Sequence, residues 1–163
     1  CKQPGERSGR RSLEKLVTHL PGQLEGLTHA GDRERPAIAP LGELAAAGVT
    51  LFTDDGNGVQ DPALMRRALE YARPLGITLA QHCEVASMTK GAVMHEGSCC
   101  STLGLPGWPA LAEELMVHRD IELSRLTGAP VHFLHLSTAR SVELTSTNPN
   151  GWSASAGCGP ERK

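Results

Sequence analysis

The sequence lacks an excess of positive charge, since 16 lysines and arginines stand against 18 aspartates and glutamates and the formal net charge is −2. A basic surplus is what attracts nucleic acid and anionic membranes, so neither is expected as a partner. The sequence also lacks any apolar run near the roughly 18 residues that a membrane span requires, and its polar first residues do not resemble a signal peptide. We therefore expect a cytoplasmic protein whose partner is a small molecule or another protein.

Cysteine is scarce and irregularly placed. The five cysteines are odd in number, and no two of them are separated by the two-residue gap that is typical of zinc knuckles. They are Cys1, Cys83, Cys99, Cys100 and Cys158. This pattern predicts neither a disulfide framework nor a structural zinc site, and we expect buried or incidental thiols.

Regular patterning is confined to the middle of the chain. Residues 1–40 are rich in glycine, proline, arginine and glutamate, and residues 145–163 show no hydrophobic period, so both ends are expected to be irregular or disordered. Residues 41–144 are expected to form the folded segment. The full length of 163 residues is that of a single domain.

Three short runs of apolar and β-branched residues predict strands at residues 48–53, 77–84 and 130–138. About two dozen residues after the second run are expected to form a long loop, and loops of that length are usually functional. Strands that alternate with helices at this spacing favour a parallel sheet, so the predicted fold class is α/β.

Two helices are predicted between these strands. The first has Asp61 as its N-cap and Pro62 as its first residue, and it ends at Gly76. The second begins at Pro109 and ends at Gly128. Its apolar face is expected to contain Ala112, Leu115, Met116, Leu123 and Leu126.

Each predicted strand ends in side chains that can bind a cation. Asp54 and Asp55 follow the first strand, His82 lies in the second and His135 in the third. The carboxyl ends of parallel strands meet at one edge of a sheet, where ligands bind. A carboxylate and two imidazoles are ligands that zinc uses in catalytic sites, where it lowers the pKa of a bound water to about 7. Spacing alone supports a metal site and an ordinary set of turn and packing residues about equally.

The other histidines are expected to have structural roles. His132 precedes His135 by three positions, so strand alternation predicts that the two side chains point to opposite faces and that His132 is packed. The remaining four occur in the long loop, on a helix and in the irregular N-terminal part, and are not expected to be ligands. They are His95, His118, His19 and His29.

Several stretches of the sequence together resemble bacterial dihydroorotases. The longest is residues 42–56, which ends in Thr-Asp-Asp-Gly. The shorter ones are residues 65–72, Gln-His-Cys-Glu at 81–84, His-Glu-Gly at 95–97, Gly-Leu-Pro-Gly-Trp-Pro at 104–109 and His-Leu-Ser-Thr at 135–138. Each motif alone is weak, but the combination is specific and extends over about 100 residues, roughly from Leu41 to Leu144.

This resemblance implies a partial TIM-like (β/α) barrel of the amidohydrolase superfamily, about strands four to six. It implies an enzyme that reversibly cyclises N-carbamoyl-L-aspartate to dihydroorotate in de novo pyrimidine biosynthesis. By the same resemblance the metal ligands are Asp55, His82 and His135, with Asp54 as the alternative to Asp55. Two zinc ions are expected in the complete barrel, bridged by the Asp55 carboxylate at the position where related dihydropyrimidinases and allantoinases use a carboxylated lysine.

The sequence also departs from the dihydroorotase pattern. It contains no His-x-His motif, and it offers no counterpart of the family's general acid and base aspartate. A complete barrel of this kind needs about 250 residues. We therefore expect an internal fragment that is inactive and marginally stable by itself and that holds at most one zinc ion weakly.

Two other functions remain open. One is an allantoinase-like or other cyclic amidohydrolase, and the other is a non-catalytic dihydroorotase-like scaffold subunit of a transcarbamoylase complex. The full-length protein is expected to bind a small-molecule substrate, with a homo-oligomer or a transcarbamoylase as further partners. The presence of Asp55, His82 and His135 together favours the catalytic lineage.

Overall fold

The protein is described by a computed structural model that covers residues 28–30, 36–146 and 153–156. Its main element is a parallel sheet with the strand order β3-β4-β7-β8. The strands of this sheet are β3 (Leu51–Thr53), β4 (Thr78–Gln81), β7 (Val131–Leu136) and β8 (Ser153–Ala156). Parallel strands joined by helices make this an α/β fold, and this part of the prediction is confirmed.

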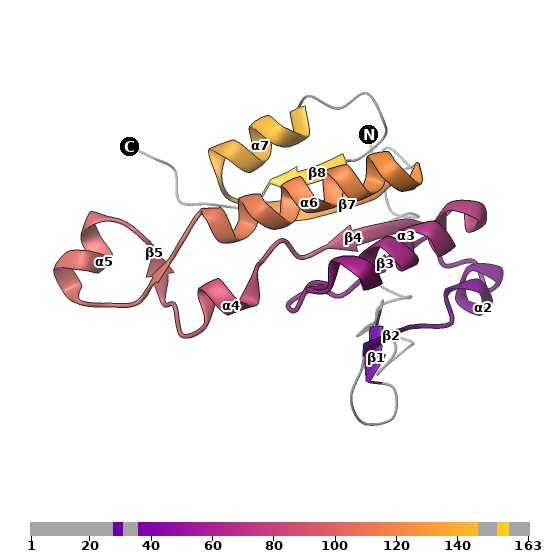
Figure 1. Ribbon diagram of the computed structural model, residues 1–163, viewed down its shortest axis with the longest axis horizontal. Coiled ribbons are helices and arrows are strands. Elements are labelled where there is room, and N and C mark those ends of the chain that lie inside the picture. The colour runs from indigo at the N-terminus through magenta and orange to yellow at the C-terminus, as the bar shows by residue number, and fades with distance from the viewer. Residues whose placement is uncertain (1–27, 31–35, 147–152, 157–163) are drawn as a thin grey trace, which may run out of the picture.

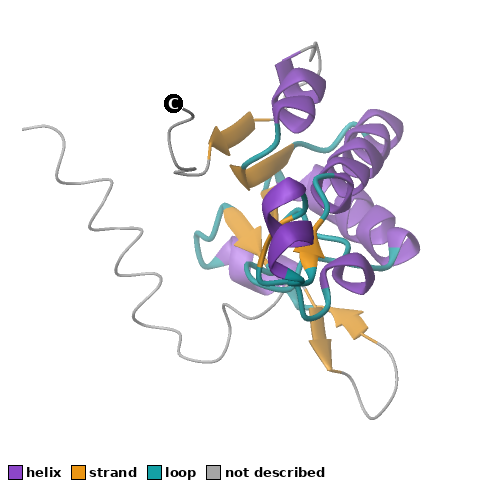
Figure 2. Cartoon of the chain, turned by 90° about the vertical axis from the view of Figure 1, so that its left-hand side faces the viewer, coloured by secondary structure: helices purple, strands orange, loops and turns teal. Residues whose placement is uncertain are grey.

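The two long helices, α3 (Pro62–Leu75) and α6 (Leu111–Thr127), connect β3 to β4 and β4 to β7. They lie side by side on one face of the sheet, as Figures 1 and 2 show. Two shorter helices, α2 (Leu41–Ala46) and α7 (Ala139–Ser146), precede β3 and follow β7. None of the helices in the described ranges is both long enough and apolar enough to cross a membrane.

The core lies between the sheet and its helical layer. The fully buried side chains that fill it include Met65, Leu69, Leu79, Met116, Val117, Val131 and Phe133. Strand β4 is hydrogen-bonded on both sides, to β3 and to β7, and its Leu79 pairs with Phe52 of β3 and with Val131 of β7. Burying one such large apolar side chain stabilises the fold by about 1.5–3 kcal/mol, so these elements hold the strand ends in place.

Helix α3 has the termini that its sequence predicts. The Asp61 side chain accepts hydrogen bonds from the backbone N–H groups of Ala63 (2.7 Å) and Leu64 (3.3 Å), and Pro62 occupies the first turn. Gly76 ends the helix in the left-handed conformation with φ 64°. An aspartate N-cap of this kind stabilises a helix by about 0.5–2 kcal/mol, and the predicted boundaries are confirmed.

The predicted apolar face of α6 is partly wrong. Leu115 and Leu126 are 47% and 63% exposed, whereas the helix buries Glu113, Asp120 and Ser124. The reason is that these three polar side chains find hydrogen-bond partners at the end of β4 and in the segments just before and just after β7. Periodicity of apolar residues cannot detect a face that buries polar groups with their partners.

Regular structure also extends into segments that were expected to be loop or irregular. The long loop contains α4 (Ala86–Thr89), β5 (Met94–His95), α5 (Ser98–Leu103) and β6 (Gly107–Trp108), which form the excursion at the left of Figure 1. The ends contain the antiparallel pair β1 (Thr28–Ala30) and β2 (Pro36–Ile38), and β8. These strands are only two to four residues long, too short for a hydrophobic period to appear in the sequence. Residues 1–27, 31–35, 147–152 and 157–163 of these ends lie outside the described residues.

Candidate metal centre

The side chains of Asp55, His82 and His135 come together at the carboxyl ends of three neighbouring parallel strands. Asp55 follows β3, His82 follows β4 directly, and His135 is the penultimate residue of β7. The register places Thr53 beside Ala80 and Gln81 beside Phe133, so Asp55, His82 and His135 each lie one or two positions beyond these paired residues. Because the sheet fixes the roots of all three side chains, their convergence is a property of the fold.

The three ligand atoms form a small triangle. Nδ1 of His82 lies 3.1 Å from Nε2 of His135 and 3.4 Å from Oδ1 of Asp55, and the third side, from His135 Nε2 to Asp55 Oδ1, is 3.2 Å. A zinc ion with tetrahedral bonds of about 2.0–2.2 Å requires ligand atoms about 3.3–3.6 Å apart. The triangle therefore fits a divalent cation of this size after adjustments of only a few tenths of an ångström.

The immediate surroundings suit a site that takes a ligand from solvent. The side chains of Asp55 and His135 are 59% and 46% exposed, whereas that of His82 is 17% exposed. Burial raises the pKa of Asp55, but the hydrogen bond and positive charge of His135, the charge of His82 and the Gly56 amide outweigh this effect and lower it below its ordinary value. The Asp55 carboxylate is therefore ionised at neutral pH, as metal coordination requires.

Of the two aspartates in the turn after β3, the structure brings Asp55 to the histidines. Asp54 is buried, and its carbonyl oxygen accepts the backbone N–H groups of Asn57 (3.0 Å) and Gly58 (2.9 Å), which closes the turn. Asp54 is not a member of the cluster of metal-ligand type formed by Asp55, His82 and His135. The arrangement agrees with the choice of Asp55 as the candidate ligand, and it leaves Asp54 with a structural position.

Gly58 lets this turn approach β4 closely. Its φ is +59°, and a Cβ atom on it would lie 2.3 Å from the carbonyl oxygen of His82. That separation is far below any van der Waals contact, and the oxygen belongs to the backbone and cannot rotate away. A glycine is therefore required here if the Asp55 turn is to lie against His82.

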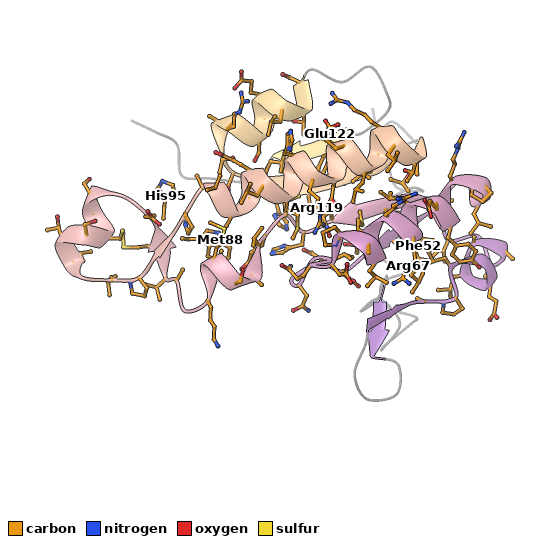
Figure 3. All side chains as sticks on the ribbon, viewed as in Figure 1. Phe52, Arg67, Met88, His95, Arg119 and Glu122 are labelled. Atoms are coloured by element: carbon orange, nitrogen blue, oxygen red, sulfur yellow. The ribbon has the colours of Figure 1, made fainter. Side chains whose placement is uncertain are left out.

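A buried network holds the same turn from the other side. Gln81 accepts the Val59 N–H (3.0 Å) and donates to Asp120 (2.8 Å), a residue of α6 that is completely buried. Arg119, labelled in Figure 3, pairs with Asp120 and donates to the carbonyl oxygens of Val59 (2.8 Å) and Gln60 (2.9 Å). Burial raises the pKa of Asp120, and the bonds from Arg119 and Gln81 offset part of that rise. This network links the β3 turn, β4 and α6.

His135 has an unusual backbone conformation. Its φ is +35°, and among the described residues it is the one non-glycine residue with a positive φ. The register of β7 with β8 also shifts between Phe133 and Leu136, and Leu136 rather than His135 is buried with Val131 and Phe133. The strand is therefore irregular at His135, which breaks the alternation used to compare it with His132. A strained residue held in place by its surroundings is typical of a functional position.

Glu113 of α6 fixes the chain directly after His135. Its carboxylate accepts the backbone N–H groups and the hydroxyl groups of both Ser137 and Thr138, at 2.6–3.2 Å. Burial raises the pKa of Glu113, but these hydrogen bonds, together with one from Ser141, lower it overall. No sign of this role is visible in the sequence, because the pattern of apolar residues along a helix does not distinguish a buried glutamate from an exposed one.

Glu84 is a second residue that sequence reasoning left without a role. Its Oε2 atom lies 2.9 Å from Nε2 of His82, on the side of the ring opposite to the triangle, and both side chains are 17% exposed. Its position two residues after His82, within the Gln-His-Cys-Glu motif, was the available signal. Cys83, between them, is buried, and burial raises the pKa of its thiol, so it remains protonated and is a poor ligand.

The other described histidines lie away from the triangle. His132 lines an open pocket at the amino end of the sheet with Thr50, Leu51, Gly76 and Thr78, and burial lowers its pKa. His95 lies on β5 in the excursion (Figure 3), and His118 is exposed on α6. None of these three belongs to the cluster of metal-ligand type. His19 lies outside the described residues, and His29 lies in β1.

Comparison with known proteins places these observations in a family context. A family model described as Dihydro-orotase-like matches residues 25–141. The dihydroorotases of Mycobacterium leprae and Mycobacterium tuberculosis are 52% identical over 109 residues and 54% identical over 99 residues. The two alignments cover 66% and 61% of this chain but 25% and 23% of the relatives, so the chain spans about a quarter of the length of the curated relatives it matches.

Solved structures resemble the fold at lower sequence identity. A D-hydantoinase (dihydropyrimidinase) from Thermus sp. superimposes with a TM-score of 0.57 and 22% identity, over 71% of this chain and 28% of that chain. A likeness at this identity establishes a shared fold alone. The arrangement of strands and helices described above therefore recurs within a larger α/β protein.

Proposed function

The chain belongs to the dihydro-orotase-like family, and from this membership we propose that Asp55, His82 and His135 bind zinc in the active site of a cyclic amidohydrolase. The observation that carries the proposal is the triangle of one carboxylate and two imidazole atoms with sides of 3.1–3.4 Å. These are ligand types that zinc prefers, and three protein ligands leave a coordination position open. Residues 41–144 would then correspond to about strands four to six of a TIM-like barrel, with β8 continuing the sheet.

The residues of this chain would contribute binding and orientation to the reaction. A zinc ion, when bound, polarises a carbonyl group and lowers the pKa of a water molecule to about 7. Asp55 supplies a negative charge beside it, which keeps the site electrically suited to a cation, and the exposure of Asp55 and His135 leaves the site open to a small substrate. The strand ends hold the three ligands before any cation arrives, which reduces the cost of ordering them.

The substrate we propose is the dihydroorotate ring, formed reversibly from N-carbamoyl-L-aspartate in pyrimidine synthesis. Identity of about half of the aligned residues to proteins named dihydroorotase supports this choice over the hydantoinases, which share 22% or less. A complete set of three candidate ligands in one site favours the catalytic lineage over a scaffold subunit. We propose that ligands outside this sequence complete the site, because the sequence has no His-x-His motif, and that the chain by itself does not turn over substrate.

A chimera tests the proposed function. Residues 41–144 would replace the matching segment of the Mycobacterium leprae dihydroorotase, and the purified chimera would be assayed for ring opening of dihydroorotate, hydantoin and allantoin. We expect activity on dihydroorotate that Asp55→Asn removes, while His118→Gln, which alters an exposed histidine outside the triangle, leaves it unchanged. A folded, zinc-loaded chimera that opens hydantoin or allantoin and leaves dihydroorotate intact would contradict the proposed substrate.

A further inference from the structure

His82 lies between acidic groups on both sides of its ring. Its Nε2 atom is 2.9 Å from Oε2 of Glu84, and its Nδ1 atom is 3.1 Å from Nε2 of His135 and 3.4 Å from Oδ1 of Asp55. A neutral imidazole carries one proton, on one of its two nitrogens. The side on which that proton is held decides which nitrogen offers a lone pair, and hence whether the ring can bind a cation at the triangle.

Glu84 is held in place so that it can accept that proton. Its second carboxylate oxygen, Oε1, accepts the hydroxyl group of Thr89, a residue of α4 that is only 5% exposed. Its backbone is fixed as well, since the Glu84 N–H donates to the His82 carbonyl oxygen (3.1 Å) and the Gln60 side chain donates to the Glu84 carbonyl oxygen (2.9 Å). The carboxylate is therefore oriented before a cation binds.

Asp55 competes for the same proton from the opposite side. Its Oδ1 atom is an acceptor near Nδ1 of His82, so without Glu84 the Nδ1–H form of the ring would gain a hydrogen bond to Asp55. In that form the lone pair lies on Nε2 and points away from the triangle. Two acceptors thus favour opposite tautomers of one ring, and the shorter contact is the one to Glu84.

We propose that Glu84 is a positioning residue that holds the His82 proton on Nε2 and thereby directs the Nδ1 lone pair at the metal centre formed with Asp55 and His135. This inference rests on the proposed function for the identity of the bound group, because the metal centre itself is part of that proposal. Thr89 supports Glu84 from α4, so the start of the long excursion after β4 contributes to the site. Partners of this kind typically change metal affinity by about 10- to 100-fold when they are removed.

The test uses the full 163-residue chain and four variants. Glu84→Ala removes the acceptor, Glu84→Gln keeps an amide oxygen that can accept from Nε2, and Thr89→Val removes only the supporting hydroxyl. Glu96→Ala is the matched control, because Glu96 is an exposed carboxylate of the same excursion. Imidazole ¹⁵N chemical shifts report the tautomer of His82 in the metal-free chain, and calorimetry with zinc chloride reports affinity. Circular dichroism confirms that each variant is folded.

We expect the Nε2–H tautomer of His82 in the unaltered chain, in Glu84→Gln and in Glu96→Ala. Glu84→Ala should move the population toward Nδ1–H and weaken zinc binding by about 10- to 100-fold, and Thr89→Val should shift both in the same direction by less. An unchanged His82 tautomer in folded Glu84→Ala would overturn the inference. A complete absence of zinc binding by the unaltered chain would instead overturn the proposed function, and the tautomer would still decide the role of Glu84.

Discussion

Gly58 offers the sharpest test of how the turn after β3 is held against β4, because Gly76 provides an internal control. Both glycines have nearly the same left-handed φ, +59° and +64°, but a Cβ atom on Gly58 would lie 2.3 Å from the His82 carbonyl oxygen, whereas nothing lies within 4 Å of a Cβ atom on Gly76. The left-handed conformation costs a non-glycine residue about 1–2 kcal/mol, and reduced entropy of the unfolded chain offsets about 0.4–1 kcal/mol. Gly76→Ala should therefore lower the free energy of unfolding by about 1 kcal/mol.

Gly58→Ala should cost that amount and a further about 1–3 kcal/mol, since the backbone must move to relieve the overlap. With an m-value of about 2 kcal/mol/M, an extra 2 kcal/mol lowers the urea midpoint by about 1 M relative to Gly76→Ala. Urea unfolding followed by circular dichroism measures both variants. Gly58→Ala should also weaken zinc binding, because the movement carries Asp55 away from His82, and Gly76→Ala should not. Equal midpoints for the two variants would refute the reasoning.

Three further predictions concern residues around the site and the core. Glu113→Ala should lower the free energy of unfolding by about 2–3 kcal/mol, because the Ser137 and Thr138 donors lose their acceptor. Since the folded pKa of Glu113 is depressed, the stabilisation by its carboxylate should be present above its ordinary pKa of 4.5 and disappear as the pH falls through the lower folded value. The urea midpoints of Glu113→Gln and of the unaltered chain should therefore converge in acid, and parallel pH profiles would count against this role. The exposed Cys99 should react with a thiol-alkylating reagent in the folded chain, whereas the buried Cys83 should be protected until urea unfolds the chain. Mass spectrometry that found Cys83 labelled first would contradict its burial. Met116→Ala should lower the free energy of unfolding by about 2–5 kcal/mol, and Leu126→Lys should lower it by less than about 0.5 kcal/mol, because these two side chains of α6 are 1% and 63% exposed. Thermal unfolding that ranks the two variants the other way would contradict the observed face of the helix.

The fold was predictable where local signals are strong. Asp61, Pro62 and Gly76 mark the ends of α3 through chemistry that acts within a few residues, so the helix follows from the sequence alone. The buried face of α6 did not follow, since the buried Glu113 and Asp120 have partners from other parts of the chain, namely Ser137, Thr138 and Gln81, in addition to the neighbouring Arg119. Short strands such as β5 and β8 depend on pairing with distant segments, which no local pattern records.

The sequence predicted the three residues that the structure brings together at the candidate site. Strand ends and residue types pointed to Asp55, His82 and His135, and the preference for Asp55 over Asp54 came from resemblance to dihydroorotases. Regular strand alternation does not hold at His135, because the positive φ and the register shift there interrupt the strand. Glu84 lies in the Gln-His-Cys-Glu motif, but its contact with His82 is seen only when the ring of His82 is placed and its Nε2 atom is found beside the carboxylate.

The direct test of the metal centre is anomalous X-ray diffraction at the zinc edge from crystals of the chain grown with zinc chloride. We predict one anomalous peak within about 2.0–2.2 Å of Oδ1 of Asp55, Nδ1 of His82 and Nε2 of His135. A peak on the Glu84 side of His82, or zinc bound only at residues outside this triangle, would contradict the proposed site.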